Sequence, residues 1–252
     1  MVHSNLNLAQ YLKQKAARLE NVRLPRSVCF TCKRPSVTCY CNQIETFNSF
    51  PRFVILMHKD EVKRTIATGR MAHLCMGNSE LYEGTNFTHC EPVNQIIRDP
   101  ANYPVLLYPA IGAADLSAMT LPHRQQLFPA DRKLVVFLID GTWSQARKVK
   151  RISTNVGRLP TLCFTPSRPS QFRVRRQPKP NCYSTIEAIH ELIDLLGPER
   201  PDHENLLKVF NQMVEKQINY ETHFKSLRGF KATRGKRDPV LSADESAFGP
   251  SL

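Results

Sequence analysis

The sequence feature that most constrains the fold is an uninterrupted apolar run that ends in a carboxylate. Residues 134–139 are all apolar and include two valines and an isoleucine, and Asp140 follows directly. Such a run is typical of a strand that is covered on both faces, which favours a parallel sheet. Ligands of open parallel sheets bind at the carboxyl ends of the strands. We therefore expect Asp140 to lie at the rim of a site.

The segment after this strand is predicted to form a helix. Residues 142–151 contain no glycine or proline, and either Asp140 or Thr142 can cap the first turn. Two interpretations are open: Asp140 merely caps the helix while the single tryptophan, Trp143, fills the core, or both residues line a site. Because a helix N-terminus stabilises a nearby carboxylate, we expect Asp140 to keep a low pKa.

Further candidate strands and helices alternate along the chain. Strands are predicted at residues 52–58, 105–108 and 161–165, and helices at residues 64–76 and 188–196. The second helix is preceded by Ser184 and Glu187 at the spacing of a capping box. This alternation predicts an α/β fold, a mostly parallel sheet with flanking helices. With 252 residues, 41% of them hydrophobic, the chain can bury one substantial core.

The α/β body is expected to carry smaller segments at both ends. The predicted division is a helical N-terminal extension at 1–28, a four-cysteine module at 29–51, the α/β domain at 52–227 and a C-terminal tail at 228–252. The tail is separated because apolar periodicity is lost after Leu227, as is typical of loose or docking segments.

Half of the eight cysteines are concentrated in one short segment. The four-cysteine module contains Cys29, Cys32, Cys39 and Cys41. Two close pairs separated by a loop are typical of four thiolates around a tetrahedral zinc ion; unrelated thiols or two disulfides are the alternatives. A closed four-thiolate site has no open position, so we expect a structural role. The module would fix a core-poor segment and present Lys33 and Arg34 to nucleic acid.

Positive charge is concentrated in one part of the chain. Residues 141–186 contain ten lysines and arginines and no acidic residue, whereas the whole chain carries a formal charge of +13. A block of one sign beside a candidate site predicts a polyanionic partner, namely RNA or DNA. The residues expected to contact RNA are Arg147, Lys148, Arg151, Arg173, Arg175 and Arg176.

No segment predicts insertion into a membrane or secretion. No apolar stretch approaches membrane-spanning length, and the N-terminal residues lack a basic segment followed by an apolar core. We therefore expect a cytoplasmic protein without a membrane partner, with an anionic membrane surface as the weaker alternative to RNA. The sequence identifies no protein partner.

Four motifs in this order resemble the DTW-domain family, which is named after its Asp-x-Thr-Trp motif. They are the four-cysteine module, His58-Lys-Asp-Glu61 followed by Thr68-Gly69-Arg70, Asp140-Gly-Thr-Trp143, and Ser184-Thr185-Ile186-Glu187-Ala188. The resemblance implies a tRNA-uridine aminocarboxypropyltransferase. Such an enzyme moves the 3-amino-3-carboxypropyl group of S-adenosylmethionine to N3 of a tRNA uridine and releases methylthioadenosine. It also implies a SPOUT-like α/β fold with a knotted cofactor site.

The resemblance gives the site residues expected roles. Asp140 is the candidate base for the weakly acidic N3–H of uridine, or a group that orients this N–H or stabilises the sulfonium. The expected cofactor-binding residues are Thr142, Trp143, Ser184 and Thr185. Where the family is expected to have Asn-Thr-Gly, this chain has Ala67-Thr68-Gly69, so a contact from that asparagine is absent or replaced. A SPOUT-like RNA methyltransferase and a non-catalytic, zinc-containing RNA-binding module are the alternative functions.

Overall fold

A parallel sheet forms the centre of the protein. The computed structural model describes residues 27–175, 182–198 and 201–227. The strands are β1 (Arg52–His58), β2 (Glu80–Gly84), β3 (Asn102–Leu107), β4 (Ala114–Asp115), β5 (Lys133–Asp140) and β6 (Thr161–Cys163). They form one sheet in the order β2-β1-β5-β3-β6-β4, and all five strand pairs are parallel. The α/β class and the parallel sheet predicted from the sequence are confirmed.

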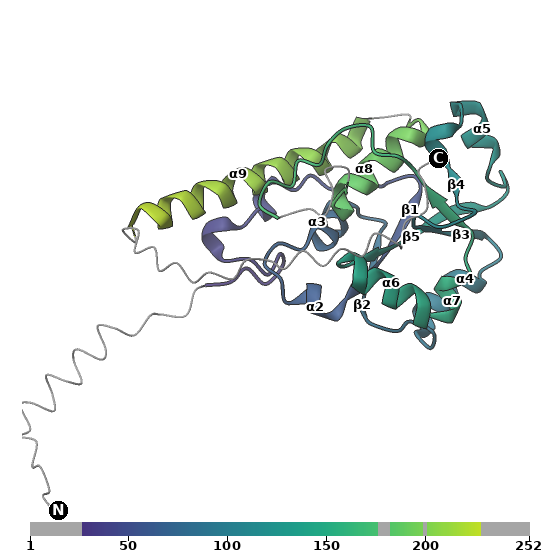
Figure 1. Cartoon of the computed structure of the whole chain (residues 1–252), viewed down its shortest axis with the longest axis horizontal. Helices are drawn as coiled ribbons and strands as arrows, with labels where there is room; N and C mark the ends of the chain where they lie inside the picture. The colour runs from purple at the N-terminus through teal and green to yellow at the C-terminus, as the bar shows by residue number, and fades with distance from the viewer. Residues whose placement is uncertain (1–26, 176–181, 199–200, 228–252) are drawn as a thin grey trace, which may run out of the picture.

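Helices cover both faces of this sheet (Figure 1). One face carries α3 (Thr68–Cys75), α8 (Thr185–Leu196) and α9 (Glu204–Leu227), and the other carries α4 (Glu91–Arg98), α6 (Trp143–Ile152) and α7 (Thr154–Gly157). The shorter helices are α2 (Lys59–Val62), α5 (Leu121–Gln126), η1 (Ser36–Thr38), η2 (Cys41–Gln43), η3 (Leu116–Ala118) and η4 (Pro201–His203). None of the described helices has the length and apolar character needed to cross a membrane.

The continuous apolar runs of the central strands are explained by the two helical layers. In β1, Phe53 and Ile55 contribute to the core under α3, α8 and α9, whereas Val54 and Leu56 contribute to the core under α4 and α6. All four side chains are fully buried. Burial of each such side chain stabilises the fold by about 1.5 to 3 kcal/mol. A polar residue on either face of β1 or β5 would remove this contribution.

Several predicted boundaries are wrong by a few residues. The helix predicted at 64–76 begins only at Thr68, because the backbone turns after α2, where the amide of Arg64 donates to the carbonyl of Glu61. The strand predicted at 105–108 starts three residues earlier and includes Pro104, a residue that argues against a strand in any sequence pattern. The strand predicted at 161–165 ends at Cys163.

The four-cysteine module packs directly on the α/β body. Cys32 and Tyr40 belong to the same core cluster as residues of α8 and α9. Arg34 is 1% exposed and donates from Nη2 to Oε1 of Gln217 in α9 at 2.9 Å. The expectation that Arg34 is presented to nucleic acid is therefore wrong, whereas Lys33 is exposed.

The division of the chain at residue 51 stays a prediction, and so do the other predicted boundaries. Most of the predicted N-terminal extension (1–26) and the whole predicted tail (228–252) lie outside the described residues.

Candidate functional site

Asp140 and His58 lie side by side at the carboxyl edge of the sheet. They end the adjacent strands β5 and β1, in which Met57 and Asp140 are register partners. The chain leaves β1 toward β2 on one side and leaves β5 toward β6 on the other. Ligands of open parallel sheets bind where the strand order reverses in this way.

The carboxylate of Asp140 is buried, and only one of its two oxygens is hydrogen-bonded to the described residues. Its side chain is 4% exposed, and Oδ1 accepts a hydrogen bond from Oγ1 of Thr185 at 2.5 Å. The other oxygen, Oδ2, is also buried and has no hydrogen-bond partner among the described residues. Most buried polar atoms are hydrogen-bonded, so Oδ2 is an exception: the protein encloses it, and the described residues supply no donor to it.

The environment of Asp140 raises its pKa to about 6, mainly through burial and further through the carboxylate of Glu61. The hydrogen bond from Thr185 and the charges of Arg175 and Arg70 act in the opposite direction. The expectation of a low pKa is therefore wrong, because the loss of hydration outweighs the favourable groups nearby. A carboxylate with a pKa near 6 is a better proton acceptor than an ordinary aspartate.

Glu61 forms ion pairs with two arginines, of which Arg175 acts on the carboxylate of Asp140. It is 2% exposed, and its Oε1 lies 3.0 Å from Nε of Arg64 and 3.4 Å from Nη2 of Arg175. Arg175 precedes the undescribed residues 176–181 and was predicted to contact RNA. Its ion pair with Glu61 places Arg175 at the edge of the Asp140 site, and its contact with RNA stays a prediction.

Arg70 is a second buried group with an unused polar atom. Its side chain is 7% exposed and donates from Nη2 to the carbonyl of Val62 at 3.0 Å. Its Nη1 has no hydrogen-bond partner within the part of the chain that the structure describes. A ligand with an anionic group can satisfy this guanidinium while a donor satisfies Asp140.

Gly69 explains why the Thr68-Gly69-Arg70 motif sits here. A Cβ atom at this position would lie 2.6 Å from Cγ of Asp140, closer than real Cβ atoms approach other atoms. Glycine therefore allows α3 to pass directly against the carboxylate. Ala67, at the position where the family resemblance predicts asparagine, is the N-cap of α3 and makes no side-chain capping bond.

In the turn after β5, Thr142 caps α6, whereas the side chain of Trp143 is exposed. Thr142 is the N-cap of α6: its Oγ1 accepts from the amide of Gln145 at 3.3 Å, and its own amide donates to Oε1 of Gln145 at 2.7 Å. Trp143 is 44% exposed and meets the ring of Tyr108 edge to face, with 6.4 Å between centroids. The interpretation that Trp143 fills the core is therefore wrong, and its free surface is available to a ring of a ligand.

The start of α8 places Thr185, rather than Ser184, against Asp140. Ser184 donates from Oγ to Oε2 of Glu187 at 2.6 Å, and its amide donates to the same oxygen at 2.8 Å. Glu187 also accepts from the amide of Gln171 at 2.6 Å. Glu187 thus holds Ser184 at the start of α8 and ties this helix to Gln171.

A basic cleft of about 670 Å³ lies beside α6 and α7. Its lining includes Tyr108, Ile111, Arg147, Lys150, Arg151 and Arg158. Tyr108 also contacts Trp143, so this residue joins the cleft to the turn after Asp140. Ile111 is fully exposed, and Nζ of Lys150 lies 5.0 Å from the centroid of the Tyr108 ring. Cations and exposed aromatic or apolar surface in one cleft are typical of nucleic-acid binding.

The residues predicted to contact RNA fall into separate groups. Arg147 and Arg151 line the cleft, and Lys148 is exposed on the same helix. Arg173 forms an ion pair with Glu215, and Arg175 pairs with Glu61 as described above. Arg176 lies outside the described residues. Sequence reasoning missed Lys150 and Arg158 as lining residues, although they belong to the same one-signed block.

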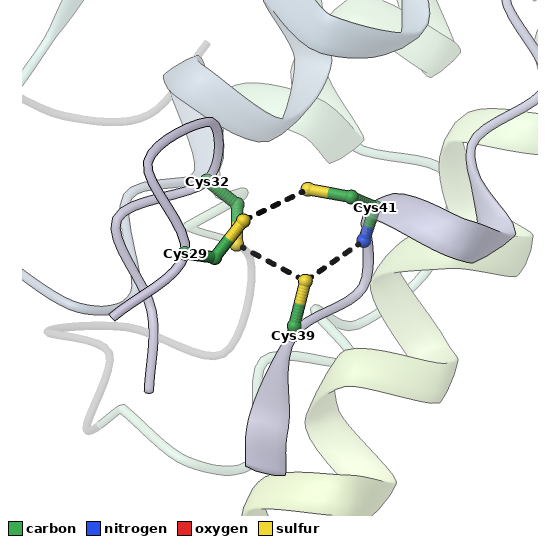
Figure 2. Close-up of side chains that lie close together, drawn as sticks. All are labelled: Cys29, Cys32, Cys39 and Cys41. Atoms are coloured by element: carbon green, nitrogen blue, oxygen red, sulfur yellow. Dashed lines mark hydrogen bonds between the residues drawn. The ribbon is translucent and has the colours of Figure 1, made fainter. Parts of the chain in front are cut away.

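The four thiols of the four-cysteine module converge on one point (Figure 2). The Sγ atoms of Cys29 and Cys41 are 3.7 Å apart, and so are those of Cys32 and Cys39. All four are free thiols. Zn–S bonds of about 2.3 Å in a tetrahedron give S···S edges of about 3.8 Å, so this donor set fits a zinc ion closely.

The loop between the first two cysteines is also shaped for a thiolate. Backbone hydrogen bonds from Cys32 and Thr31 lower the pKa of Cys29 to about 6. Lys33 follows with a positive φ of 60°, and its amide donates to the carbonyl of Cys29 at 2.9 Å. This tight turn aims amide donors at the sulfur.

Comparisons with known proteins match most of the chain. Residues 26–218 match the DTW domain. The chain is 27% identical over 204 residues to a Drosophila melanogaster protein named tRNA-uridine aminocarboxypropyltransferase 2, with 77% of this chain and 76% of the relative covered. A Mus musculus protein of the same name is 26% identical over 202 residues, with 77% and 65% covered. An Arabidopsis thaliana tRNA-uridine aminocarboxypropyltransferase A is 22% identical over 228 residues, with 77% and 82% covered. No solved structure matches.

Proposed function

The chain belongs to the DTW domain family, and on this premise we propose that it transfers the 3-amino-3-carboxypropyl group of S-adenosylmethionine to N3 of a tRNA uridine. The observation that carries the proposal is the buried carboxylate of Asp140, whose Oδ2 is unpartnered among the described residues and whose pKa lies near 6. The names of the relatives support the transfer of an aminocarboxypropyl group to a tRNA uridine.

In the proposed reaction, N3 of uridine attacks the side-chain carbon that is bonded to the sulfonium. The new N–C bond forms as the C–S bond breaks, and its electron pair neutralises the sulfur of the departing methylthioadenosine. The N3 proton passes to Oδ2 of Asp140. Positioning of both reactants and removal of this weakly acidic proton are the contributions required of the protein.

The proposed cofactor contacts surround this carboxylate. Thr142, Trp143, Ser184 and Thr185 remain the proposed cofactor-binding residues, and Arg70 and Arg175 are added as cationic neighbours of Asp140. The unused Nη1 of Arg70 suits the carboxylate of the transferred group, and the exposed face of Trp143 suits the adenine or the target base. Thr185 would act mainly by holding Oδ1, which leaves Oδ2 free for the proton.

The proposal also includes a structural zinc ion, a SPOUT-like topology and a cytoplasmic location. Zinc is supported by the fit of the sulfur distances in the four-cysteine module, and it would hold the segment before β1 against α9. The SPOUT-like relation is proposed from the family membership and agrees with the parallel sheet, and the knotted cofactor site is proposed from the family resemblance alone. The reducing conditions that keep such thiols available are those of the cytoplasm.

The tRNA backbone is proposed to follow the basic cleft beside α6. Replacing Arg151 by glutamine is expected to weaken tRNA binding several-fold and to reduce the slope of log affinity against log salt by about one, since one phosphate contact is lost. Fluorescence anisotropy at several salt concentrations measures both effects. Arg98→Gln, which removes an exposed arginine from α4, is the matched control. An unchanged salt slope for Arg151→Gln would move the RNA path away from this cleft.

The rate of transfer is expected to depend on pH through Asp140. The carboxylate must be ionised to accept a proton, so activity should rise tenfold per pH unit below about pH 6 and level off above it. Because the pKa in the folded state lies above the ordinary value of 3.8, ionisation of Asp140 also opposes folding, and this cost appears as pH rises from about 4 to about 6. Single-turnover rates between pH 5 and 8, with tRNA binding measured in parallel, test the first expectation. A rate that is flat across this range contradicts the role as base.

The transferred group can be identified with two labelled forms of S-adenosylmethionine. Label in the carboxyl group should appear in tRNA, whereas label in the methyl group should stay with methylthioadenosine. The reverse pattern would identify a methyltransferase. Tight tRNA binding without incorporation of either label would identify a binding module.

A further inference from the structure

A second cluster of potential metal ligands lies at the far end of α8 from Thr185. This histidine–carboxylate cluster consists of His190 and Asp194 in α8, His203 in η4 and Glu204 at the start of α9. Each side chain can offer one ligand atom, and these four atoms all lie within 4.8 Å of one another. The cluster joins α8 and α9, which run side by side over one face of the sheet (Figure 1).

The helical register explains how the cluster forms. His190 and Asp194 are four residues apart in α8 and therefore share one face of that helix. His203 and Glu204 are consecutive and lie at the junction of η4 and α9. The two pairs thus approach from different helices, as is common for metal sites in helical layers.

The two imidazoles are buried, and each has an unused nitrogen. His190 is 1% exposed and His203 is 3% exposed. Nε2 of His190 and Nδ1 of His203 have no hydrogen-bond partner among the described residues. Their rings are 4.7 Å apart between centroids. A buried imidazole nitrogen without a partner is costly, and an ion bound at Nε2 would complete His190, whereas Nε2 of His203 already faces Oδ1 of Asp194.

The distances are close to those of a zinc site. Bonds of about 2.0 to 2.1 Å to nitrogen or oxygen in a tetrahedron give edges of about 3.3 to 3.4 Å between ligand atoms. Nε2 of His190 lies 3.4 Å from Oε2 of Glu204, whereas Nε2 of His203 lies 2.7 Å from Oδ1 of Asp194. The side chains of Asp194 and Glu204 are 44% and 62% exposed, so both carboxylates have room to adjust around an ion.

The charges of the cluster also favour a cation. Asp194 and Glu204 bring two negative charges, and both carboxylates lie against the buried imidazoles of His190 and His203. The described cation that faces the cluster is the exposed Arg168, whose Nη2 lies 3.4 Å from Nδ1 of His190. This contact lies on Nδ1, which also faces Oδ2 of Asp194 at 3.2 Å, whereas Nε2 faces Oε2 of Glu204.

We propose that His190, Asp194, His203 and Glu204 bind a zinc ion that links α8 to α9. Two histidines and two carboxylates are a donor set that zinc accepts. The site would be structural, since the protein supplies four ligands. It would fix α8, whose opposite end holds Asp140 through Thr185, and α9, against which the four-cysteine module packs.

The proposal is tested by comparing the zinc content of the full chain with that of a double variant, Asp194→Asn with Glu204→Gln. Both substitutions keep the shape of partly exposed side chains, and circular dichroism checks that the variant is folded. After equilibration with zinc and removal of the excess, elemental analysis should find one zinc ion less per chain in the double variant. Both proteins contain the same four-cysteine module, so any zinc that it binds cancels in the difference between their zinc contents.

Asp202→Asn is the matched control, because Asp202 is an exposed carboxylate next to His203 that lies outside the cluster. It should retain as much zinc as the unmodified chain. Added zinc should also raise the melting temperature of the unmodified chain and of Asp202→Asn by more than that of the double variant, which keeps only the four-cysteine module. Equal zinc content in the unmodified chain and the double variant would overturn the proposal, and so would an equal loss in the control.

Discussion

Replacing Asp140 by asparagine is expected to lower the rate of transfer by a factor of about 10² to 10⁴, the usual contribution of a general base. Asparagine keeps the shape of the side chain and can still accept the hydrogen bond from Thr185 at its carbonyl oxygen. It cannot take up the N3 proton. Single-turnover transfer from S-adenosylmethionine to unmodified tRNA measures the effect.

Binding and stability separate this effect from a loss of structure. tRNA affinity should change little, because Asp140 does not line the basic cleft. Above pH 6 the variant should be at least as stable as the unmodified chain, since the ionised carboxylate of Asp140 is buried at a cost. Asp131→Asn, in the exposed turn before β5, is the control and should transfer normally. Transfer at the full rate by Asp140→Asn would leave Asp140 a purely structural role.

Loss of the zinc ion proposed for the four-cysteine module is expected to lower the stability of the fold strongly. Cys32→Ser should release this ion and destabilise the fold by about 3 to 5 kcal/mol, which lowers the melting temperature on the order of 10 °C. The reason is that Cys32 and Tyr40 form part of the main core with α8 and α9, so the module cannot detach without exposing that core. Thermal unfolding and zinc analysis of the same samples measure the effect.

The control for this variant is Cys90→Ser, which changes a cysteine outside both metal-ligand clusters. Its zinc content and melting temperature should stay close to those of the unmodified chain. If Cys32→Ser retained its zinc and its melting temperature, the module would be held by its protein contacts alone.

The central elements could be predicted because their sequence patterns have a single physical explanation. The apolar runs of β1 and β5 fit strands between two helical layers, and the turn at Asp140 fits a strand followed by a capped helix. The edge strands β2 and β4 were missed because both are short or half exposed, so neither shows a clear apolar pattern. The long helix α9 was missed because its charged residues dilute the apolar face.

The site could be located from the sequence but its electrostatics could not. The position of Asp140 follows from the strand it ends, whereas its raised pKa depends on burial by α3 and α8, which lie far from it in the sequence. The pairing of Arg175 with Glu61 joins residues 114 positions apart. Composition does not reveal such a pairing between distant residues, and the predicted contact of Arg175 with RNA stays a prediction.

The masses of the tRNA nucleosides after reaction show directly whether the protein transfers an aminocarboxypropyl group to uridine. Unmodified tRNA is incubated with the purified protein and S-adenosylmethionine, digested to nucleosides and analysed by mass spectrometry, with Asp140→Asn run in parallel. With the unmodified chain we expect a uridine that carries one aminocarboxypropyl group. With Asp140→Asn we expect much less of this modified uridine. A methylated nucleoside, or no modified nucleoside despite tight tRNA binding, would contradict the proposed transfer.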